Sequence, residues 1–80
     1  MRYDLLPITQ ADKIAYLIEE CGEVLQAIGT LQRFGEHPTD HKTGATYDNI
    51  VDLFAELNDL ERAIRLVRES FDNARRSRTG

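Results

Sequence analysis

Two long segments of this chain repeat their apolar residues at steps of three and four, and this periodicity constrains the fold most strongly. The first stripe consists of Ile14, Leu17, Ile18, Cys21, Val24, Leu25, Ile28 and Leu31. The second consists of Ile50, Leu53, Phe54, Leu57, Leu60, Ile64, Val67 and Phe71. Apolar residues at this spacing line one face of an α-helix. No run of strand length alternates apolar and polar residues, so the sequence predicts an all-α chain.

Capping and helix-breaking residues set the expected bounds of the first helix. Thr9 with Asp12 three residues later resembles a capping box, in which Asp replaces the usual Glu. At the other end, Gly35 suits a C-cap, and Pro38 prevents easy continuation. We therefore predict the first helix at about residues 10–34.

The second helix has less definite start and stop signals. Thr46 or Asp48 is expected to cap it, and we place it at about residues 47–74. The polar segment at about residues 35–46 is expected to form the connecting loop. The arginine-rich residues 75–80 are expected to be a frayed basic tail.

Two long helices with a short connection form an antiparallel hairpin, which buries little by itself. The 80 residues are 41% hydrophobic, which suits a single globular domain over residues 1–80. Such a short chain encloses a limited core. We therefore expect the hairpin to assemble into a four-helix bundle as a homodimer or homotetramer, with Cys21 as a small core residue.

Charge and hydropathy narrow the expected surroundings of the protein. The formal net charge is −4, which argues against general nucleic-acid binding. No apolar run approaches the roughly 18 residues that span a bilayer, so no membrane association is expected. Residues 1–10 carry no apolar stretch of signal-peptide length, so cytoplasmic residence is expected. His37 and His41 fall in the loop, where we expect them to be solvated rather than to bind zinc.

Acidic residues recur at helical spacing on both segments. The first contains Glu19, Glu20 and Glu23, and the second contains Glu56 and Asp59. At about 100° per residue, Glu20–Glu23 and Glu56–Asp59 occupy the same rotational flank of their own apolar stripes. In an antiparallel pair, equal offsets fall on the same side of the helix plane. The two acidic pairs are thus expected to face the same side of the hairpin.

The two acidic pairs also match in height along the expected hairpin. Glu23 lies 11 residues before residue 34, and Asp59 lies 12 residues after residue 47. Antiparallel packing then brings four carboxylates to one level, with Glu19 close behind. Their repulsion would be costly in a partly buried site, and a hard divalent cation would remove it. The sequence therefore predicts a Mg²⁺ site, for which Mn²⁺ could substitute.

The run Glu19-Glu20-Cys21-Gly22-Glu23, followed by apolar residues and then by Glu56-Leu57-Asn58-Asp59, resembles the MazG-like all-α nucleoside triphosphate pyrophosphohydrolases. The likeness covers about residues 13–66. It implies Mg²⁺-dependent hydrolysis between the α and β phosphates, which gives a nucleoside monophosphate and pyrophosphate. Carried over by motif position, the metal ligands would be Glu20, Glu23, Glu56 and Asp59. Glu19 would be the catalytic base or would bind a second ion.

Substrate-binding residues are expected near these acids. Lys13 and Arg62 are candidate cations for phosphate charge, and Asn58 lies inside the second motif. Tyr16 marks the helix face where a base pocket is expected, unless a neighbouring subunit supplies it. The interval of 32 residues between Glu23 and Glu56 is longer than is usual in that family, so the loop is expected to hold an insertion.

Three readings of the sequence remain open. Each acid taken singly is more often part of a solvated helix face. The whole chain could also be a non-enzymatic helical hairpin that acts as an adaptor or regulatory subunit through association. A third reading is a scaffold that binds nucleotide and metal but hydrolyses slowly.

Overall fold

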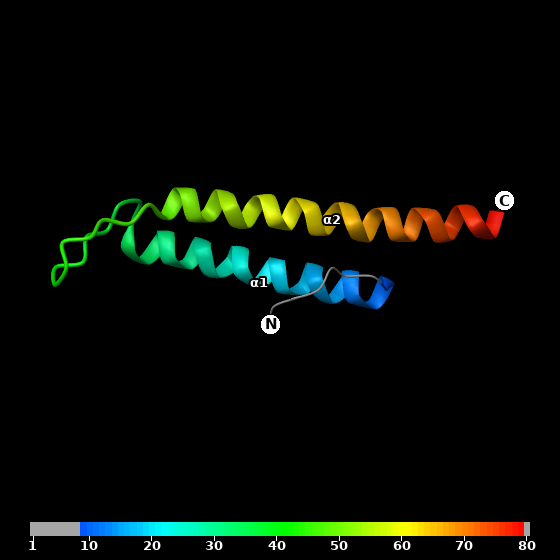
Figure 1. The fold of residues 1–80 in the computed structure, drawn as a ribbon, viewed down its shortest axis with the longest axis horizontal. Coiled ribbons are helices and arrows are strands. Elements are labelled where there is room, and N and C mark those ends of the chain that lie inside the picture. The colour runs from blue at the N-terminus through cyan, green and yellow to red at the C-terminus, as the bar shows by residue number, and fades with distance from the viewer. Residues whose placement is uncertain (1–8, 80) are drawn as a thin grey trace.

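The computed structural model describes residues 9–79, which form two long antiparallel helices joined by a loop (Figure 1). Helix α1 spans Gln10–Phe34 and helix α2 spans Asn49–Thr79. The predicted all-α hairpin is therefore confirmed. The molecule measures 61 × 21 × 14 Å, with a radius of gyration of 17.0 Å. A compact domain of this length would have a radius of gyration of about 12 Å, so the hairpin is an elongated rod.

Helix α1 has the predicted bounds because both of its ends are capped as the sequence indicates. The Asp12 N–H donates to Thr9 Oγ1 at 3.0 Å, and the Thr9 N–H donates to Asp12 Oδ2 at 3.2 Å. Such a cap contributes about 1 kcal/mol. At the other end, the Gly35 N–H donates to Leu31 O at 2.8 Å, and Gly35 takes a φ of 81° that favours glycine.

Helix α2 starts two residues later and ends five residues later than predicted. Of the two expected caps, Asp48 acts: its Oδ1 accepts from the N–H groups of Ile50 and Val51, each at 3.1 Å. The expected frayed tail is helical through Thr79. Residues 75–79 hold no helix breaker, and their arginines interact favourably with the negative end of the helix dipole.

The two ends of the hairpin differ in how α1 and α2 are connected. A hydrogen bond from Gln10 Nε2 to Ser70 Oγ, at 3.4 Å, joins the start of α1 to α2. Beyond Ser70, helix α2 continues past the start of α1 (Figure 1). At the opposite end, the loop of residues 35–48 doubles back on itself through an antiparallel bridge between Thr39 and Thr46. Its tight turn includes Gly44, whose φ of 75° again favours glycine.

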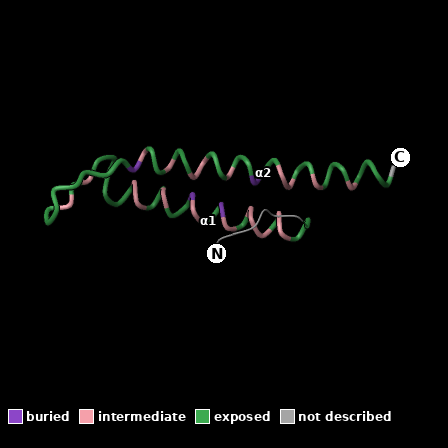
Figure 2. The backbone as a smooth tube through the Cα atoms, in the orientation of Figure 1, coloured by how far each residue is buried: buried purple, intermediate pink, exposed green. Residues whose placement is uncertain are grey.

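Few of the described residues are buried (Figure 2). Among the described residues, the buried apolar side chains are Val24 and Ala63, with exposed fractions of 7% and 0%. Cys21, which was expected in the core, is exposed. Neither α1 nor α2, as far as the structure describes them, has an apolar stretch of the length needed to span a bilayer.

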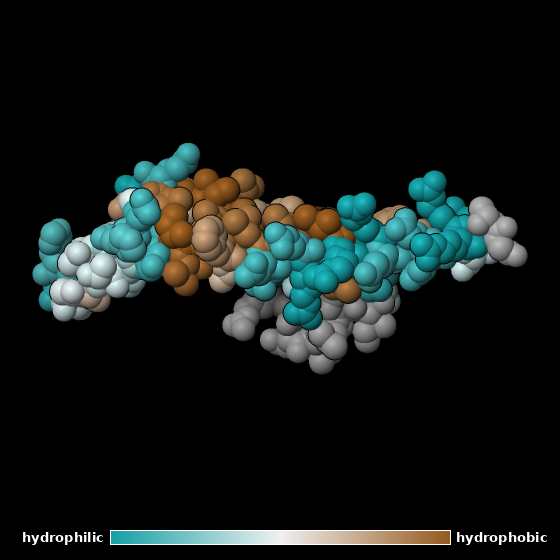
Figure 3. All heavy atoms as spheres, turned by 90° about the horizontal axis from the view of Figure 1, so that it is seen from above, coloured by the Kyte–Doolittle hydropathy of each residue, from teal (hydrophilic) through white to brown (hydrophobic). Residues whose placement is uncertain are grey.

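Much of the predicted apolar stripe remains open to solvent. The most exposed large members of the two stripes are Leu25, Ile18 and Phe54, with exposed fractions of 69%, 67% and 59%. Apolar residues gather on the part of the surface nearer the loop (Figure 3). The expected four-helix bundle would cover such a surface, but a single hairpin leaves it exposed.

Candidate metal centre

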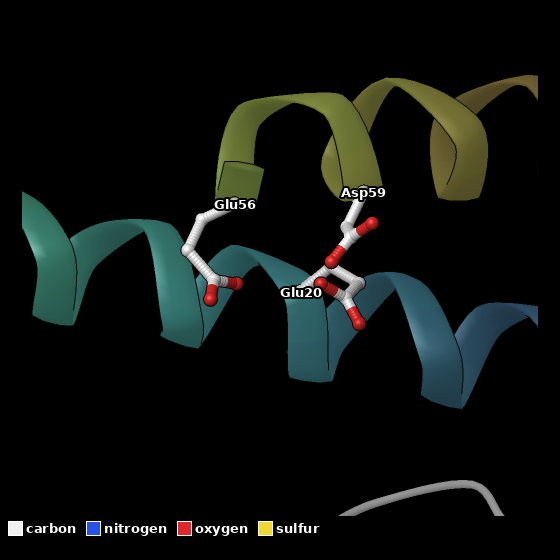
Figure 4. Close-up of side chains that lie close together, drawn as sticks. All are labelled: Glu20, Glu56 and Asp59. Atoms are coloured by element: carbon white, nitrogen blue, oxygen red, sulfur yellow. The ribbon is translucent and has the colours of Figure 1, made fainter. Parts of the chain in front are cut away.

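Three carboxylates from the two helices meet at mid-hairpin (Figure 4). One oxygen each of Glu20, Glu56 and Asp59 lies within 4.8 Å of the others. Glu56 and Asp59 are three residues apart and share one face of α2, while Glu20 reaches them from α1. Glu20 is 6% exposed, Glu56 is half-buried and Asp59 is exposed. The site is therefore open to solvent on the Asp59 side.

Glu23 connects the carboxyls of the two helices. Burial, a hydrogen bond with the Glu23 carboxyl, and the charges of Glu23, Asp59 and Glu56 together raise the pKa of Glu20 from 4.5 to about 7. The pKa of Glu56 is raised by a hydrogen bond with the same carboxyl, by burial, and by neighbouring acidic charges. A hydrogen bond between two carboxyls requires a proton. We call Glu20, Glu23, Glu56 and Asp59 the acidic cluster.

The chemistry of the acidic cluster suits a bound hard divalent cation better than the metal-free state. Glu20 Oε2 and Glu56 Oε2 are buried and accept no hydrogen bond from residues 9–79. Buried oxygens without a donor cost free energy, and ionised ones cost more. Carboxylate oxygens from several side chains are the ligands that Mg²⁺ prefers. The donor set can therefore hold Mg²⁺, and the open Asp59 side leaves room for water and phosphate.

The raised pKa of Glu20 makes the stability of the metal-free protein depend on pH. Its folded-state pKa of about 7 exceeds its ordinary 4.5, so the folded chain binds more protons between these values. The stabilisation is complete below pH 4.5 and is lost as pH rises through 7. In EDTA, the melting temperature of the unchanged chain should fall relative to that of Glu20→Gln between pH 5 and pH 8. Parallel melting curves for the two chains across this range would contradict the assignment.

A groove of about 380 Å³, which we call the central groove, runs from the acidic cluster toward the loop. Glu23 and Glu56 line its cluster end, and Asp52, Thr30 and Asn49 line its loop end. The charge of Asp52 also contributes to the raised pKa of Glu56. Asp52 was not among the predicted site residues, although it stands one helical turn before Glu56 at i,i+4 spacing.

Glu19 does not line the central groove. It lines a separate hollow of about 420 Å³ together with Glu23, Gly22 and Ile18, and Glu19 Oε2 is buried. Glu23 borders both spaces. The structure therefore places the expected catalytic base beside the acidic cluster but outside the three oxygens that meet within 4.8 Å.

Of the expected substrate-binding residues, Tyr16 and Arg62 lie near the acidic cluster. Burial and the charge of Glu20 raise the pKa of Tyr16, while the charge of Arg62 lowers it. Arg62 is exposed on α2, and Lys13 is half-buried on α1, three residues before Tyr16. Asn58 is exposed on α2. The structure thus puts one cation, Arg62, within electrostatic range of the tyrosine beside the carboxylates.

Asn49 is a buried polar residue that no motif or periodicity in the sequence singles out. It is 6% exposed, and its Nδ2 donates to Gly35 O at 2.8 Å. Its own N–H donates to Glu36 O at 2.9 Å, which ties the start of α2 to the end of α1. Its position directly after the capping Asp48 is the only available sequence signal.

Comparison with protein-family models, with curated proteins and with solved structures gave no match for this chain. We therefore infer the function of this chain from the geometry of the acidic cluster and from the spacing of its residues.

Proposed function

We propose that this protein is a Mg²⁺-dependent nucleoside triphosphate pyrophosphohydrolase of the MazG-like kind. It would cleave its substrate between the α and β phosphates to give a nucleoside monophosphate and pyrophosphate. The observation that carries the proposal is the acidic cluster, in which carboxylates of two antiparallel helices meet and two buried oxygens have no donor within residues 9–79. Phosphoryl transfer needs charge stabilisation and positioning more than covalent help, and the cluster offers a means of both.

Each group in and around the cluster has a role in this proposal. A bound Mg²⁺ ion would neutralise phosphate charge and lower the pKa of a water molecule. Glu20, Glu56 and Asp59 hold the ion, and Glu23 shares in holding it and orients the Glu20 and Glu56 carboxyls. Glu19 accepts the proton of the attacking water from the neighbouring hollow.

The remaining contacts would bind the rest of the substrate. Arg62 and Lys13 offset phosphate charge on the side of Tyr16. The exposed amide of Asn58, next to Asp59, offers a hydrogen bond to the substrate.

The direct test is pyrophosphate release from a panel of canonical and modified nucleoside triphosphates, with Mg²⁺ and with EDTA. We expect pyrophosphate and a nucleoside monophosphate with Mg²⁺, and neither with EDTA. Release of a diphosphate and orthophosphate instead would place the cleaved bond elsewhere. No release from any member of the panel by a folded protein would refute the proposal.

A second candidate function rests on the exposed apolar surface. Among residues 9–79, six large apolar or aromatic side chains are more than half exposed, on a hairpin with a small core. A helical adaptor or regulatory subunit that acts only through association would also present such a surface. In that case Mg²⁺ would leave the melting temperature unchanged.

We further propose that the hairpin completes its core as a four-helix bundle, in a homodimer or homotetramer. Leu25 and Phe54 are 69% and 59% exposed, and covering the exposed part of each would contribute about 1–2 kcal/mol. The mass in solution, measured by light scattering, should be two or four times the chain mass of 9.2 kDa. Phe54→Asp should lower this mass, whereas Gln32→Glu at an exposed polar position should not. A monomeric unchanged chain would contradict this assembly.

A further inference from the structure

A second groove lies at the loop end of the hairpin, away from the carboxylates. It has a volume of about 360 Å³ and is lined by Phe34, Pro38 and Tyr47, with Thr30, Asp40 and Asn49 as polar neighbours. This volume is at the lower end of the range for small-molecule sites, which combine apolar walls with a few placed polar groups. We call it the loop-end groove.

The loop-end groove presents two aromatic rings at its surface. Phe34 is 59% exposed and Tyr47 is 51% exposed. The guanidinium of Arg33 lies over the Phe34 ring, 5.8 Å from its centroid. Exposed aromatic rings at the edge of a groove favour planar ligands, because stacking covers both partners.

Asn49 supplies a hydrogen-bond acceptor between the two grooves. Its Nδ2 donates to Gly35 O, which fixes the orientation of the amide. Its Oδ1 accepts no hydrogen bond from residues 9–79. A polar side chain that is only 6% exposed and lines both grooves is well placed to receive an N–H donor from a ligand.

The two grooves are neighbours. Both are lined by Thr30 and Asn49, and the central groove also reaches Glu23 and Glu56 of the acidic cluster. Thr30 lies seven residues after Glu23, and Asn49 lies seven residues before Glu56. At a rise of about 1.5 Å per residue, Thr30 and Asn49 therefore lie about 10 Å along their helices from the acidic residues Glu23 and Glu56.

We propose that the loop-end groove binds the base of the nucleotide, which stacks on Tyr47 and Phe34 and donates an N–H to Asn49 Oδ1. This inference rests on the proposed function, because the acidic cluster fixes where the phosphates lie. Asp40 lines the loop-end groove and Asp52 lines the loop end of the central groove. Their negative charges disfavour phosphate there and favour a neutral base. The proposed base site differs from the one expected from the sequence, which lay near Tyr16.

The first arm of the test is an NMR titration of the full chain with four ribonucleosides that lack phosphate. Adenosine, cytidine, guanosine or uridine at millimolar concentration should shift the signals of the Tyr47 ring and the Asn49 amide. Inorganic triphosphate with Mg²⁺ should instead shift the signals of Glu20 and Asp59. If none of the nucleosides shifts the Tyr47 and Asn49 signals, the base assignment is wrong.

The second arm compares two aromatic-to-leucine variants. Tyr47→Leu should raise the dissociation constant of the shifting nucleoside about tenfold, and the KM for triphosphate by a similar factor, with little change in kcat. Phe71→Leu, at an exposed ring on the part of α2 beyond Ser70, should leave both unchanged. Equal effects of the two variants would overturn the proposal. Nucleoside binding without pyrophosphate release would refute the enzymatic function and leave the base site standing.

Discussion

Glu56→Gln should lower metal-dependent pyrophosphate release by more than about 100-fold while the chain keeps its helices. The substitution retains the size of the side chain and removes one of three oxygens that meet within 4.8 Å. Loss of an outer partner of a metal site typically costs 10–100-fold, so loss of a ligand should cost more. The fold should survive, because removing a charge relieves repulsion among the acids.

The measurement is kcat/KM for the best substrate of the panel, with circular dichroism as the record of folding. Asp59→Asn should behave like Glu56→Gln, since both residues belong to the same meeting point. Glu61→Gln is the matched control, because Glu61 is an exposed acid on the same helix outside the cluster. Full turnover in both cluster variants would rule out the proposed metal site.

Mg²⁺ should raise the melting temperature of the unchanged chain by about 10 °C or more. A ligand that binds only the folded state at 100 times its dissociation constant adds about 2.7 kcal/mol. For a domain of this size, 1 kcal/mol corresponds to about 4–8 °C. Burial chiefly raises the pKa of Glu20, the hydrogen bond with Glu23 chiefly raises that of Glu56, and neighbouring acidic charges add to both. The cation would remove the repulsion among these charges.

Glu20→Gln is the informative variant for this melting experiment. At pH 8 in EDTA it should melt above the unchanged chain, because one poorly solvated negative charge is gone. Added Mg²⁺ should then stabilise it little. Both chains should be compared at the same protein concentration, since association also shifts melting. An equal rise with Mg²⁺ in both chains would place the stabilising ion outside the cluster.

Local features of the sequence account for most of the fold. The side chains of Thr9 and Asp12 cap α1 through contacts three residues apart, and Gly35 ends it through its own backbone freedom. The sequence alone is sufficient to predict such short-range interactions. The end of α2 was misplaced because arginine-rich segments without a breaker have no clear stop.

The approach of Glu20 to Glu56 and Asp59 could also be predicted, because helical geometry converts residue spacing into a face and a height. Residue spacing predicts which side chains of two helices meet only where both helices are regular and their connection is short. It did not reveal that Asn49 is buried, because that depends on how the loop brings Glu36 and Gly35 back to the start of α2.

The sequence by itself determined the two helices, their antiparallel pairing and the shared side of the acidic residues. All of these follow from the periodicity and spacing of residues within a regular helix. Only the tertiary structure decided that Glu20 is buried while Asp59 stays open, and that Glu19 faces a different hollow from the central groove. Burial and the division of space into grooves depend on the distance and tilt between two packed helices, and residue spacing along one helix does not specify them.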